Sequence, residues 1–333
     1  PEYAVDASIT WRAGKDPEVI GLAVANMTGA NRILIGLAWP MVFFIFWWSI
    51  RKARTISNPQ HEQISLQMPG SISIELSLLI VATIYSFLLP LKGGISVIDA
   101  GILFSIFAYY LYIIGRQDPE EPDLMGPARL IGSLPKTQRR LSLVMLFLFS
   151  AIIVITAADP FAQGLEHTGE ELGIDKFLLL QFVAPFASEA PEFLVCGILA
   201  ARGHAALGMA ALISSKLNQW TLLLGSLPIV FSASTGTVTE LPLEGRQQLE
   251  LFLTAAQSLF AVLLFTNLKL TVRGALALMV LFLVQAVLPF DSVRLAVGIL
   301  YLILSAGLIF LRRNDIKSRA KEFLREARGQ TQG

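Results

Sequence analysis

Two glutamates and a proline interrupt an apolar stretch in the middle of the chain, FASEAPEFLV at 186–195. Glu189 and Glu192 are three residues apart, so a helix places both carboxylates on one face. Pro191 cannot donate a backbone hydrogen bond, which leaves a carbonyl oxygen one turn earlier free. Together with the hydroxyl of Ser188, these groups are hard oxygen ligands, which suit Ca²⁺, Mg²⁺, Na⁺ or protons better than soft metals. The pattern therefore indicates cation chemistry.

The chain begins with a second Pro-Glu pair, in PEYAVD at 1–6. Glu2 and Asp6 are four residues apart and share one helix face. Further polar residues follow each Pro-Glu pair within apolar sequence. They are Asn26, Asn31 and Arg32 after the first pair, and Ser214, Ser215, Lys216, Asn218 and Gln219 after the second.

The composition explains why these residues matter. Of the 333 residues, 54% are hydrophobic and 15% are charged, which is unusually apolar for a soluble protein of this length. Several apolar stretches reach about 20 residues, the length that crosses a bilayer as a helix. A charge at bilayer depth costs about 2.5–3.5 kcal/mol, so each one there is a functional candidate. Cys196 is the only cysteine, which excludes an intrachain disulfide and a thiolate metal cluster.

The apolar segments predict an all-α polytopic membrane protein with about ten transmembrane helices. These are expected at 1–12, 18–50, 72–91, 95–115, 141–158, 174–201, 205–232, 248–267, 271–289 and 293–311. Pro40 is expected to kink or split the second helix. An acidic loop is predicted at GLEHTGEELGID (164–175), and a short basic surface helix is predicted in the tail, 312–333. Lysine and arginine counts in the short loops place that tail in the cytoplasm.

The chain contains an internal repeat. Pro1 aligns with Pro191 and Pro40 with Pro228, while residues 75–92 resemble 250–269. Because the two Pro-Glu helices are expected to run in opposite directions, the repeats are predicted to be inverted, the architecture of many secondary transporters. The first repeat covers 1–115 and the second 141–311, joined by a cytoplasmic linker at 116–140. Relative to the second repeat, the first is expected to lack about one and a half N-terminal helices, on the order of 50 residues.

With these motifs in place, the sequence resembles the calcium/cation antiporter family, which includes the sodium/calcium exchangers. ASEAPE (187–192) is similar to that family's Gly-Thr-Ser-x-Pro-Glu pattern, and Pro1-Glu2 matches its end. The family's second pattern, which begins Gly-Ser-Asn, is represented in this sequence by TGANRIL (28–34) and SSKLNQW (214–220). The resemblance implies that Glu2 and Glu192 are the main calcium ligands.

Further site residues are assigned beside these two glutamates. The predicted ion-binding set adds Ser188, Glu189, Asp6, Asn26 and Asn218. Glu189 stands where the family has serine, and Arg32 and Lys216 add a cation to each repeat. These bases are predicted to balance charge, since protonated bases cannot coordinate a cation. If they replace sodium ions, proton coupling is favoured, with Asp6 and Glu189 as proton carriers.

Structural interpretations remain open for several residues. Glu2 and Glu192 would be structural if each pairs with a base across the repeat interface. As separate alternatives, Glu189 would be a salt-bridge partner of Lys216 without an ion-binding role, and Asn218 would only form an interhelical hydrogen bond. Asp99, Glu75 and Glu250 lie in first turns, where a carboxylate favours the helix dipole, and are interpreted as structural.

The predicted function is secondary antiport of Ca²⁺, or a similar divalent cation, against Na⁺ or H⁺ by alternating access. No enzymatic activity, cofactor, nucleotide or nucleic acid is expected, since no Walker-type loop is present. The expected partners are inorganic cations and the lipid bilayer, in a prokaryotic inner membrane. Two rivals remain: a proton-coupled transporter of an anionic or zwitterionic solute, and a non-transporting relative whose site is closed by salt bridges from Arg32 and Lys216.

Overall fold

The computed structural model describes residues 1–54, 64–116 and 126–313. The surface helix predicted in the tail lies outside these ranges apart from Arg312 and Arg313, as does the acidic part of the predicted linker, 117–125. Within the described ranges, each of the ten predicted helices is present as helix.

The first half begins with a short helix and a long interrupted one. α1 (Glu2–Ala13) precedes η1 (Pro17–Leu22), α2 (Ala25–Ile33), η2 (Leu34–Ala38) and α3 (Trp39–Arg54). The last four form one apolar helical segment from Pro17 to Lys52, close to the predicted 18–50. η2 is a π-helical turn that ends two residues before Pro40. Because proline cannot donate a backbone hydrogen bond, a wider turn here lets the helix continue past the missing bond.

A strand–helix–strand unit follows. It consists of β1 (Ser65–Gln67), η3 (Gly70–Ile72), α4 (Ser73–Ser86), α5 (Leu88–Lys92) and β2 (Gly94–Ile95), and it leads into α6 (Val97–Ile114). Ser96 and Asp99 form a capping box at the start of α6. Asp99 also accepts hydrogen bonds from Lys92 and Tyr85. This carboxylate therefore stabilises a helix start, as the sequence predicted.

The helix predicted at 141–158 is much longer in the structure. After α7 (Pro127–Gly132), α8 runs from Lys136 to Leu172 and contains Pro160. The loop prediction at 164–175 is therefore wrong for most of its length, and the second part of the predicted linker is also helical. Alanine, leucine, glutamine and glutamate after Pro160 favour helix. The helix ends at Gly173, which adopts φ 65° in the left-handed region favoured by glycine at helix ends.

The second half repeats the order of the first. The Pro-Glu helix comprises α9 (Lys176–Leu178), η4 (Leu179–Val183) and α10 (Ala184–Ala201). The next helix comprises α11 (Ala205–Asn218), η5 (Gln219–Leu223) and α12 (Leu224–Thr235). The chain continues through β3 (Leu241–Pro242), α13 (Gly245–Leu264), β4 (Lys269–Thr271), α14 (Val272–Val287) and α15 (Asp291–Leu311).

The two small sheets reveal the symmetry of the repeats. Leu66 pairs with Leu270 in the β1–β4 sheet, and Leu241 pairs with Ile95 in the β2–β3 sheet. A shift of 175 residues carries Leu66 to Leu241 and Ile95 to Leu270, and so converts one pairing into the other. The unit β1–α4–β2 therefore corresponds to β3–α13–β4, with α4 packed against α13. Two antiparallel helices thus each carry a strand at both ends.

The π-helical turns η2 and η5 are also equivalent, at Leu34–Ala38 and Gln219–Leu223. Their shift of 185 residues aligns Lys216 with Asn31 and Gln219 with Leu34. Arg32 and Lys216, the bases that the sequence shows in the two repeats, therefore do not occupy equivalent positions. A one-residue difference in helix register turns a side chain by about 100°, so the two bases point in different directions.

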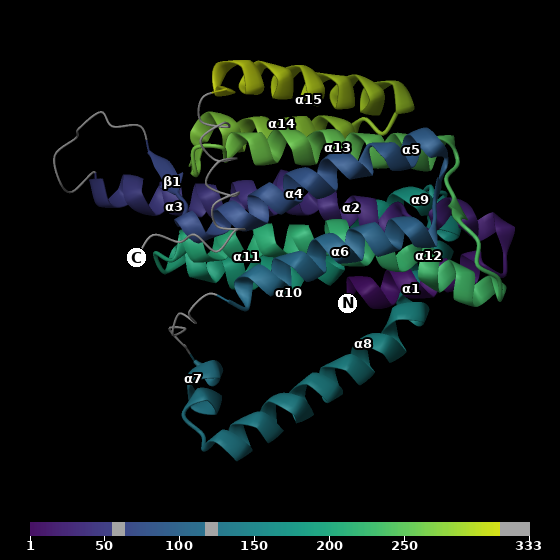
Figure 1. Cartoon of the computed structure of the whole chain (residues 1–333), viewed down its shortest axis with the longest axis horizontal. Coiled ribbons are helices and arrows are strands. Elements are labelled where there is room, and N and C mark those ends of the chain that lie inside the picture. Colours follow the sequence, from purple (N-terminus) through teal and green to yellow (C-terminus); the bar gives the residue numbers. More distant parts are fainter. Residues whose placement is uncertain (55–63, 117–125, 314–333) are drawn as a thin grey trace.

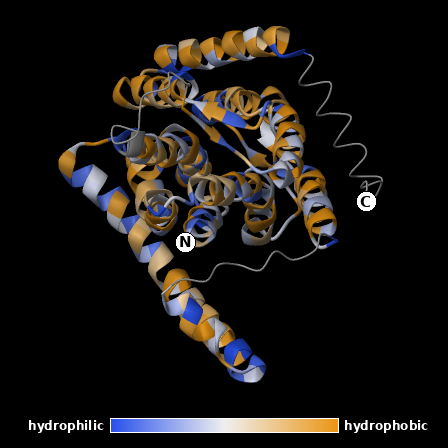
Figure 2. Ribbon diagram, turned by 90° about the vertical axis from the view of Figure 1, so that its left-hand side faces the viewer, coloured by the Kyte–Doolittle hydropathy of each residue, from blue (hydrophilic) through white to orange (hydrophobic). Residues whose placement is uncertain are grey.

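Figure 1 shows α13, α14 and α15 layered along one side of the molecule, while α8 slants away from the opposite side. Seven helical segments are long and apolar enough to cross a membrane, and α14 is a shorter apolar helix. Figure 2 shows that hydrophobic residues make up most of these helices. Exposed apolar side chains such as Phe147 and Ile155 on α8 are suited to lipid. The fold is that of a polytopic membrane protein.

The crossing of α2 with η4 is unusually close. A Cβ atom placed on Gly29 would lie 1.8 Å from the carbonyl oxygen of Gln181. Only glycine permits such an approach of two backbones. Gly29 thus fixes where the first repeat meets the Pro-Glu helix of the second.

Candidate cation site

One side-chain amide joins carboxylates from opposite repeats. Nε2 of Gln219 donates to Oε2 of Glu2 at 2.7 Å and to Oε1 of Glu189 at 2.5 Å. Glu2 lies on α1, Glu189 on α10 and Gln219 on η5. The two carboxylate oxygens that share this nitrogen therefore lie within about 5 Å of each other. The structure brings the two Pro-Glu helices together as the repeat predicted.

Glu192 lies beside this pair and is more exposed. The hydroxyl of Ser215 donates to its carboxylate at 3.0 Å, and Glu192 interacts electrostatically with both Glu2 and Glu189. Ser188 is buried and donates to the carbonyl of Pro185 at 3.2 Å. Its hydroxyl donates within its own helix, so its oxygen lone pairs remain for an incoming ligand.

Asp6 and Asn26 form the innermost part of the predicted set. Both are fully buried. They lie next to each other, with the backbone of Met27 nearby. None of these contacts has the geometry of a hydrogen bond, so both Asp6 oxygens and both Asn26 amide atoms lack one.

Asn218 faces the first repeat. Its side-chain oxygen accepts a hydrogen bond from the hydroxyl of Tyr3 on α1. Tyr3 was not predicted as a site residue, although its position next to Glu2 was a usable signal. The interhelical hydrogen bond expected as an alternative for Asn218 is therefore present.

Several oxygens in this region are buried without a hydrogen-bond donor. They are both carboxylate oxygens of Asp6, Oδ1 of Asn26, Oε2 of Glu189 and Oε1 of Gln219. Unsatisfied buried oxygens are costly, and they are the ligand type that hard cations take. Among the described residues, no three His, Cys, Asp or Glu side chains form a ready chelate. A cation here would therefore also use amide, hydroxyl or backbone oxygens.

Lys216 enters the same region without a carboxylate partner. Its side-chain nitrogen is fully buried, donates to Oδ1 of Asn31 at 2.5 Å and lies 4.1 Å from the centre of the Trp220 ring. It interacts electrostatically with Glu189, but no ion pair within 4.0 Å of Lys216 occurs in the described part of the chain. The salt bridge considered between Lys216 and Glu189 is absent.

Arg32 points to the other side of α2, away from the Pro-Glu carboxylates. It pairs with Glu250 on α13 at 2.6 Å and donates to Gln285 on α14 at 2.8 Å. Glu250 also pairs with Arg294 on α15 at 3.1 Å, and all three charged side chains are fully buried. The charge that Arg32 balances is therefore Glu250, which sequence reasoning had assigned to a helix dipole. Arg294, a base inside an apolar helix, was the signal that could have revealed this cluster.

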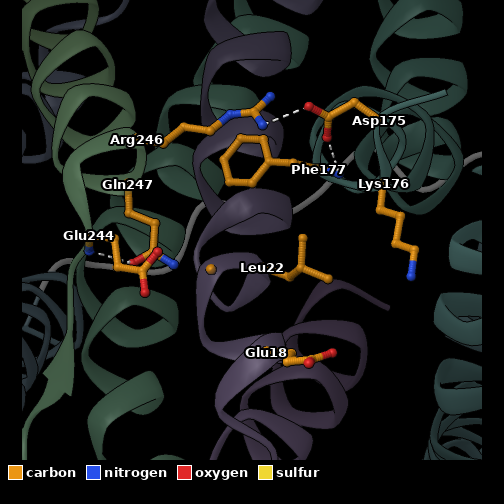
Figure 3. Close-up of a pocket in the computed structure, with 9 residues that line it drawn as sticks. Glu18, Leu22, Asp175, Lys176, Phe177, Glu244, Arg246 and Gln247 are labelled. Carbon is orange, nitrogen blue, oxygen red and sulfur yellow. Dashed lines mark hydrogen bonds and ion pairs between the residues drawn. The ribbon is translucent and has the colours of Figure 1, made fainter.

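A cavity of about 360 Å³ opens at one end of the bundle, between η1, α9 and the start of α13. Figure 3 shows Glu18 and Glu244 along its wall and Arg246 directed at Asp175. Arg246 pairs with Asp175 at 2.7 Å, and its guanidinium lies 4.0 Å from the centre of the Phe177 ring. Burial acts to raise the pKa of Asp175, but Arg246 and nearby backbone N–H groups outweigh it and hold this pKa below its ordinary value.

The fold and this region define a polytopic helical membrane protein with a buried acidic centre between two inverted repeats. A family model for the sodium/calcium exchanger protein matches residues 1–115 and 142–290. The chain belongs to the sodium/calcium exchanger family. The family membership expected from the Pro-Glu motifs is thereby confirmed.

Solved structures agree with this assignment. The chain is 40% identical to the H⁺/Ca²⁺ exchanger CAX, with a TM-score of 0.92 over 98% of this chain and 80% of that one. Native YfkE matches with 16% identity and a TM-score of 0.59 over 93% of this chain and 81% of that one. The sodium-calcium exchanger NCX_Mj matches with 17% identity and a TM-score of 0.52 over 85% and 83%. The last two similarities concern the fold alone. A search of curated proteins found no match.

Proposed function

We propose that this protein is a secondary antiporter that exchanges Ca²⁺ against protons. The observation that carries the proposal is the amide of Gln219, which holds Glu2 and Glu189 from opposite repeats. Carboxylates that meet where inverted repeats cross are suited to bind an ion that each side of the membrane reaches in turn.

Glu2, Glu189 and Glu192 would supply the charged ligands for Ca²⁺. Ser188, Asn26 and Asn218 would add neutral oxygens, and Asp6 a further carboxylate behind them. Calcium accepts six to eight oxygen ligands in flexible geometry, so mixed carboxylate, amide and hydroxyl coordination is chemically suitable. The unsatisfied oxygens of Asp6, Asn26 and Glu189 support this assignment.

Protons are proposed as the coupling ion rather than Na⁺. The buried side chain of Lys216 donates to Asn31 and interacts electrostatically with Glu189. It brings a hydrogen-bond donor and no oxygen atom, so it offers no oxygen ligand to an additional alkali cation. Four acidic residues, Glu2, Asp6, Glu189 and Glu192, could take up protons when Ca²⁺ leaves. The 40% identity to a protein described as an H⁺/Ca²⁺ exchanger supports the same choice.

The rivals are less compatible with the placement of the bases. A carboxylate-bearing solute would need Arg32, but this guanidinium is committed to Glu250 and Gln285. A site closed by salt bridges would need Arg32 and Lys216 within 4.0 Å of the Pro-Glu carboxylates, and neither forms such a pair in the described residues. Both observations favour a cation.

Transport is proposed to occur by alternating access in a prokaryotic inner membrane with the C-terminal tail in the cytoplasm. The Pro-Glu helices α1 and α10 would stay at the centre while outer helices slide past them. α8 packs against α1 and offers its other face to lipid, so it is suited to this movement.

The coupling ion is tested by calorimetry of Ca²⁺ binding in detergent. Titrations in two buffers with different ionisation enthalpies count the protons released per Ca²⁺ bound. Proton release together with insensitivity to Na⁺ supports H⁺/Ca²⁺ exchange. Competition by Na⁺ without proton release would replace it with Na⁺/Ca²⁺ exchange.

A further inference from the structure

The repeat symmetry pairs two buried glutamates that stand outside the candidate cation site. The shift of 175 residues that relates the small sheets also carries Glu75 on α4 to Glu250 on α13. The same shift carries Tyr110 on α6 to Gln285 on α14. Each repeat therefore places a glutamate and a neutral polar side chain at equivalent positions. Tyr110 donates to Glu75, whereas Gln285 accepts from Arg32.

The two copies differ in charge. Glu250 is paired with two buried arginines, Arg32 and Arg294, at 2.6 and 3.1 Å. A carboxylate paired with two buried guanidinium groups serves as a structural anchor between the helices that carry them. Among the residues that the structure describes, its counterpart Glu75 forms no ion pair with a base.

Glu75 is 7% exposed, and its Oε2 atom has no hydrogen bond. The groups that face it are the hydroxyl of Tyr110, 3.4 Å from Oε1, and the hydroxyl of Ser214. Among the described residues of α6, α11 and α13, no charged side chain interacts with it. A buried carboxylate without a base is costly when ionised, and a bound proton removes that cost.

Two hydroxyls connect Glu75 to α11, the helix that also contacts the acidic centre. The hydroxyls of Tyr110 and Ser214 are 3.4 Å apart. The adjacent residue on α11, Ser215, donates to Glu192 at 3.0 Å. On the opposite side, Gly70 and Ser71 at the start of the α4 segment are exposed. Glu75 therefore lies between the β1–β4 end of the bundle and the candidate site.

We propose that Glu75 is a proton-binding site that supplies the acidic centre from the β1–β4 end of the bundle. A proton from water binds Oε2 and gives the neutral acid. After the carboxyl group rotates, the neutral acid donates its proton to the Tyr110 hydroxyl, and Tyr110 donates its own proton to Ser214. A water molecule that bridges Ser214 and Glu192 completes the transfer, which restores the carboxylate of Glu75. This proposal rests on the proposed H⁺/Ca²⁺ exchange.

The test uses the full-length protein in proteoliposomes and compares two reactions. Uptake of ⁴⁵Ca²⁺ driven by a pH gradient requires proton delivery, whereas Ca²⁺/⁴⁵Ca²⁺ exchange at equal pH does not. Glu75→Gln is expected to slow the first reaction about tenfold or more, in the range of lost acid–base groups, and to leave the second within about twofold. Tyr110→Phe should slow the first reaction in the same direction. Glu171→Gln, at a side chain that is 69% exposed, is the matched control.

Equal loss of both reactions in Glu75→Gln would overturn the proposal, because Glu75 would then act in folding or in Ca²⁺ binding. Unchanged gradient-driven uptake would overturn it as well. If the wild-type protein shows no uptake, the proposed function fails, and Glu75 is tested separately by infrared spectroscopy. A pH step should give a carboxyl signal that disappears in Glu75→Gln, and an unaltered spectrum would contradict the proton site.

Discussion

Gln219 is the side chain on which the geometry of the acidic centre depends. Its nitrogen holds Glu2 and Glu189 near each other, and its oxygen is buried without a hydrogen bond. The Pro-Glu motifs, the paired acids on one helix face and the presence of Lys216 were visible in the sequence. The sharing of one amide by two repeats was not, because it depends on a contact between residues 217 positions apart.

Replacement of Gln219 by leucine should weaken Ca²⁺ binding about tenfold, or ~1.4 kcal/mol. The variant loses both the donor that positions two carboxylates and an oxygen that lies beside them. Equilibrium ⁴⁵Ca²⁺ binding in detergent measures the effect. Gln248→Leu, which removes only a hydrogen bond to the carbonyl of Leu243, should bind like wild type. Equal affinity of Gln219→Leu and wild type would show that this amide does not organise the site.

At the scale of helices, the spans and the order of the repeats followed from apolar length and from Pro-Glu spacing. The extension of α8 past Pro160 did not, since a proline in an otherwise helical sequence is compatible with either a kink or an end. The π-helical turns also escaped prediction, since a proline such as Pro40 is compatible with a kink, a wider turn or a helix end. The register they set is what separates Arg32 from Lys216.

The cluster of Arg32, Glu250 and Arg294 joins α2 to α13 and α15. Glu250→Gln should destabilise the protein by about 3–5 kcal/mol, since it leaves two buried guanidinium groups without their shared carboxylate. Thermal unfolding in detergent measures the loss. Adding Arg32→Met should recover part of it, because Arg294 retains Asp291. Additive losses in the double variant would rule out the coupling.

The crossing at Gly29 predicts a sharp steric effect. Gly29→Ala should lower the unfolding temperature strongly, because the added Cβ would lie 1.8 Å from a backbone oxygen, and overpacking costs about 1–3 kcal/mol or more. Gly164→Ala on α8, where the Cβ meets nothing within 4 Å, should be neutral or slightly stabilising. Similar effects of the two substitutions would contradict the close crossing.

At the scale of the whole molecule, the ion pair between Asp175 and Arg246 connects two helices at one end of the bundle. Asp175 and Arg246 join the start of the second Pro-Glu helix to α13 beside the cavity in Figure 3. Composition predicted a membrane protein, and the internal repeat together with the Lys and Arg counts of the loops predicted its inverted repeats. The sequence did not predict which loops meet at the ends of the bundle. Charged loop residues such as Asp175 and Arg246 are far apart along the chain, and only the fold brings them together.

The lowered pKa of Asp175 gives a direction for pH dependence. Its contribution to stability is present above the ordinary aspartate pKa of about 4 and is lost as pH falls through the lowered value. Wild type should therefore unfold at a higher temperature than Arg246→Gln at pH 7, and the difference should shrink below about pH 4. A difference that grows with acidification would contradict this assignment.

The central claim is tested most directly by ⁴⁵Ca²⁺ uptake into proteoliposomes under an imposed pH gradient, comparing wild type with Glu192→Gln. The account predicts uptake by wild type and by the exposed control Glu171→Gln, and loss of uptake in Glu192→Gln. Uptake in Glu192→Gln equal to that of wild type, or no uptake by wild type under this gradient, would contradict it.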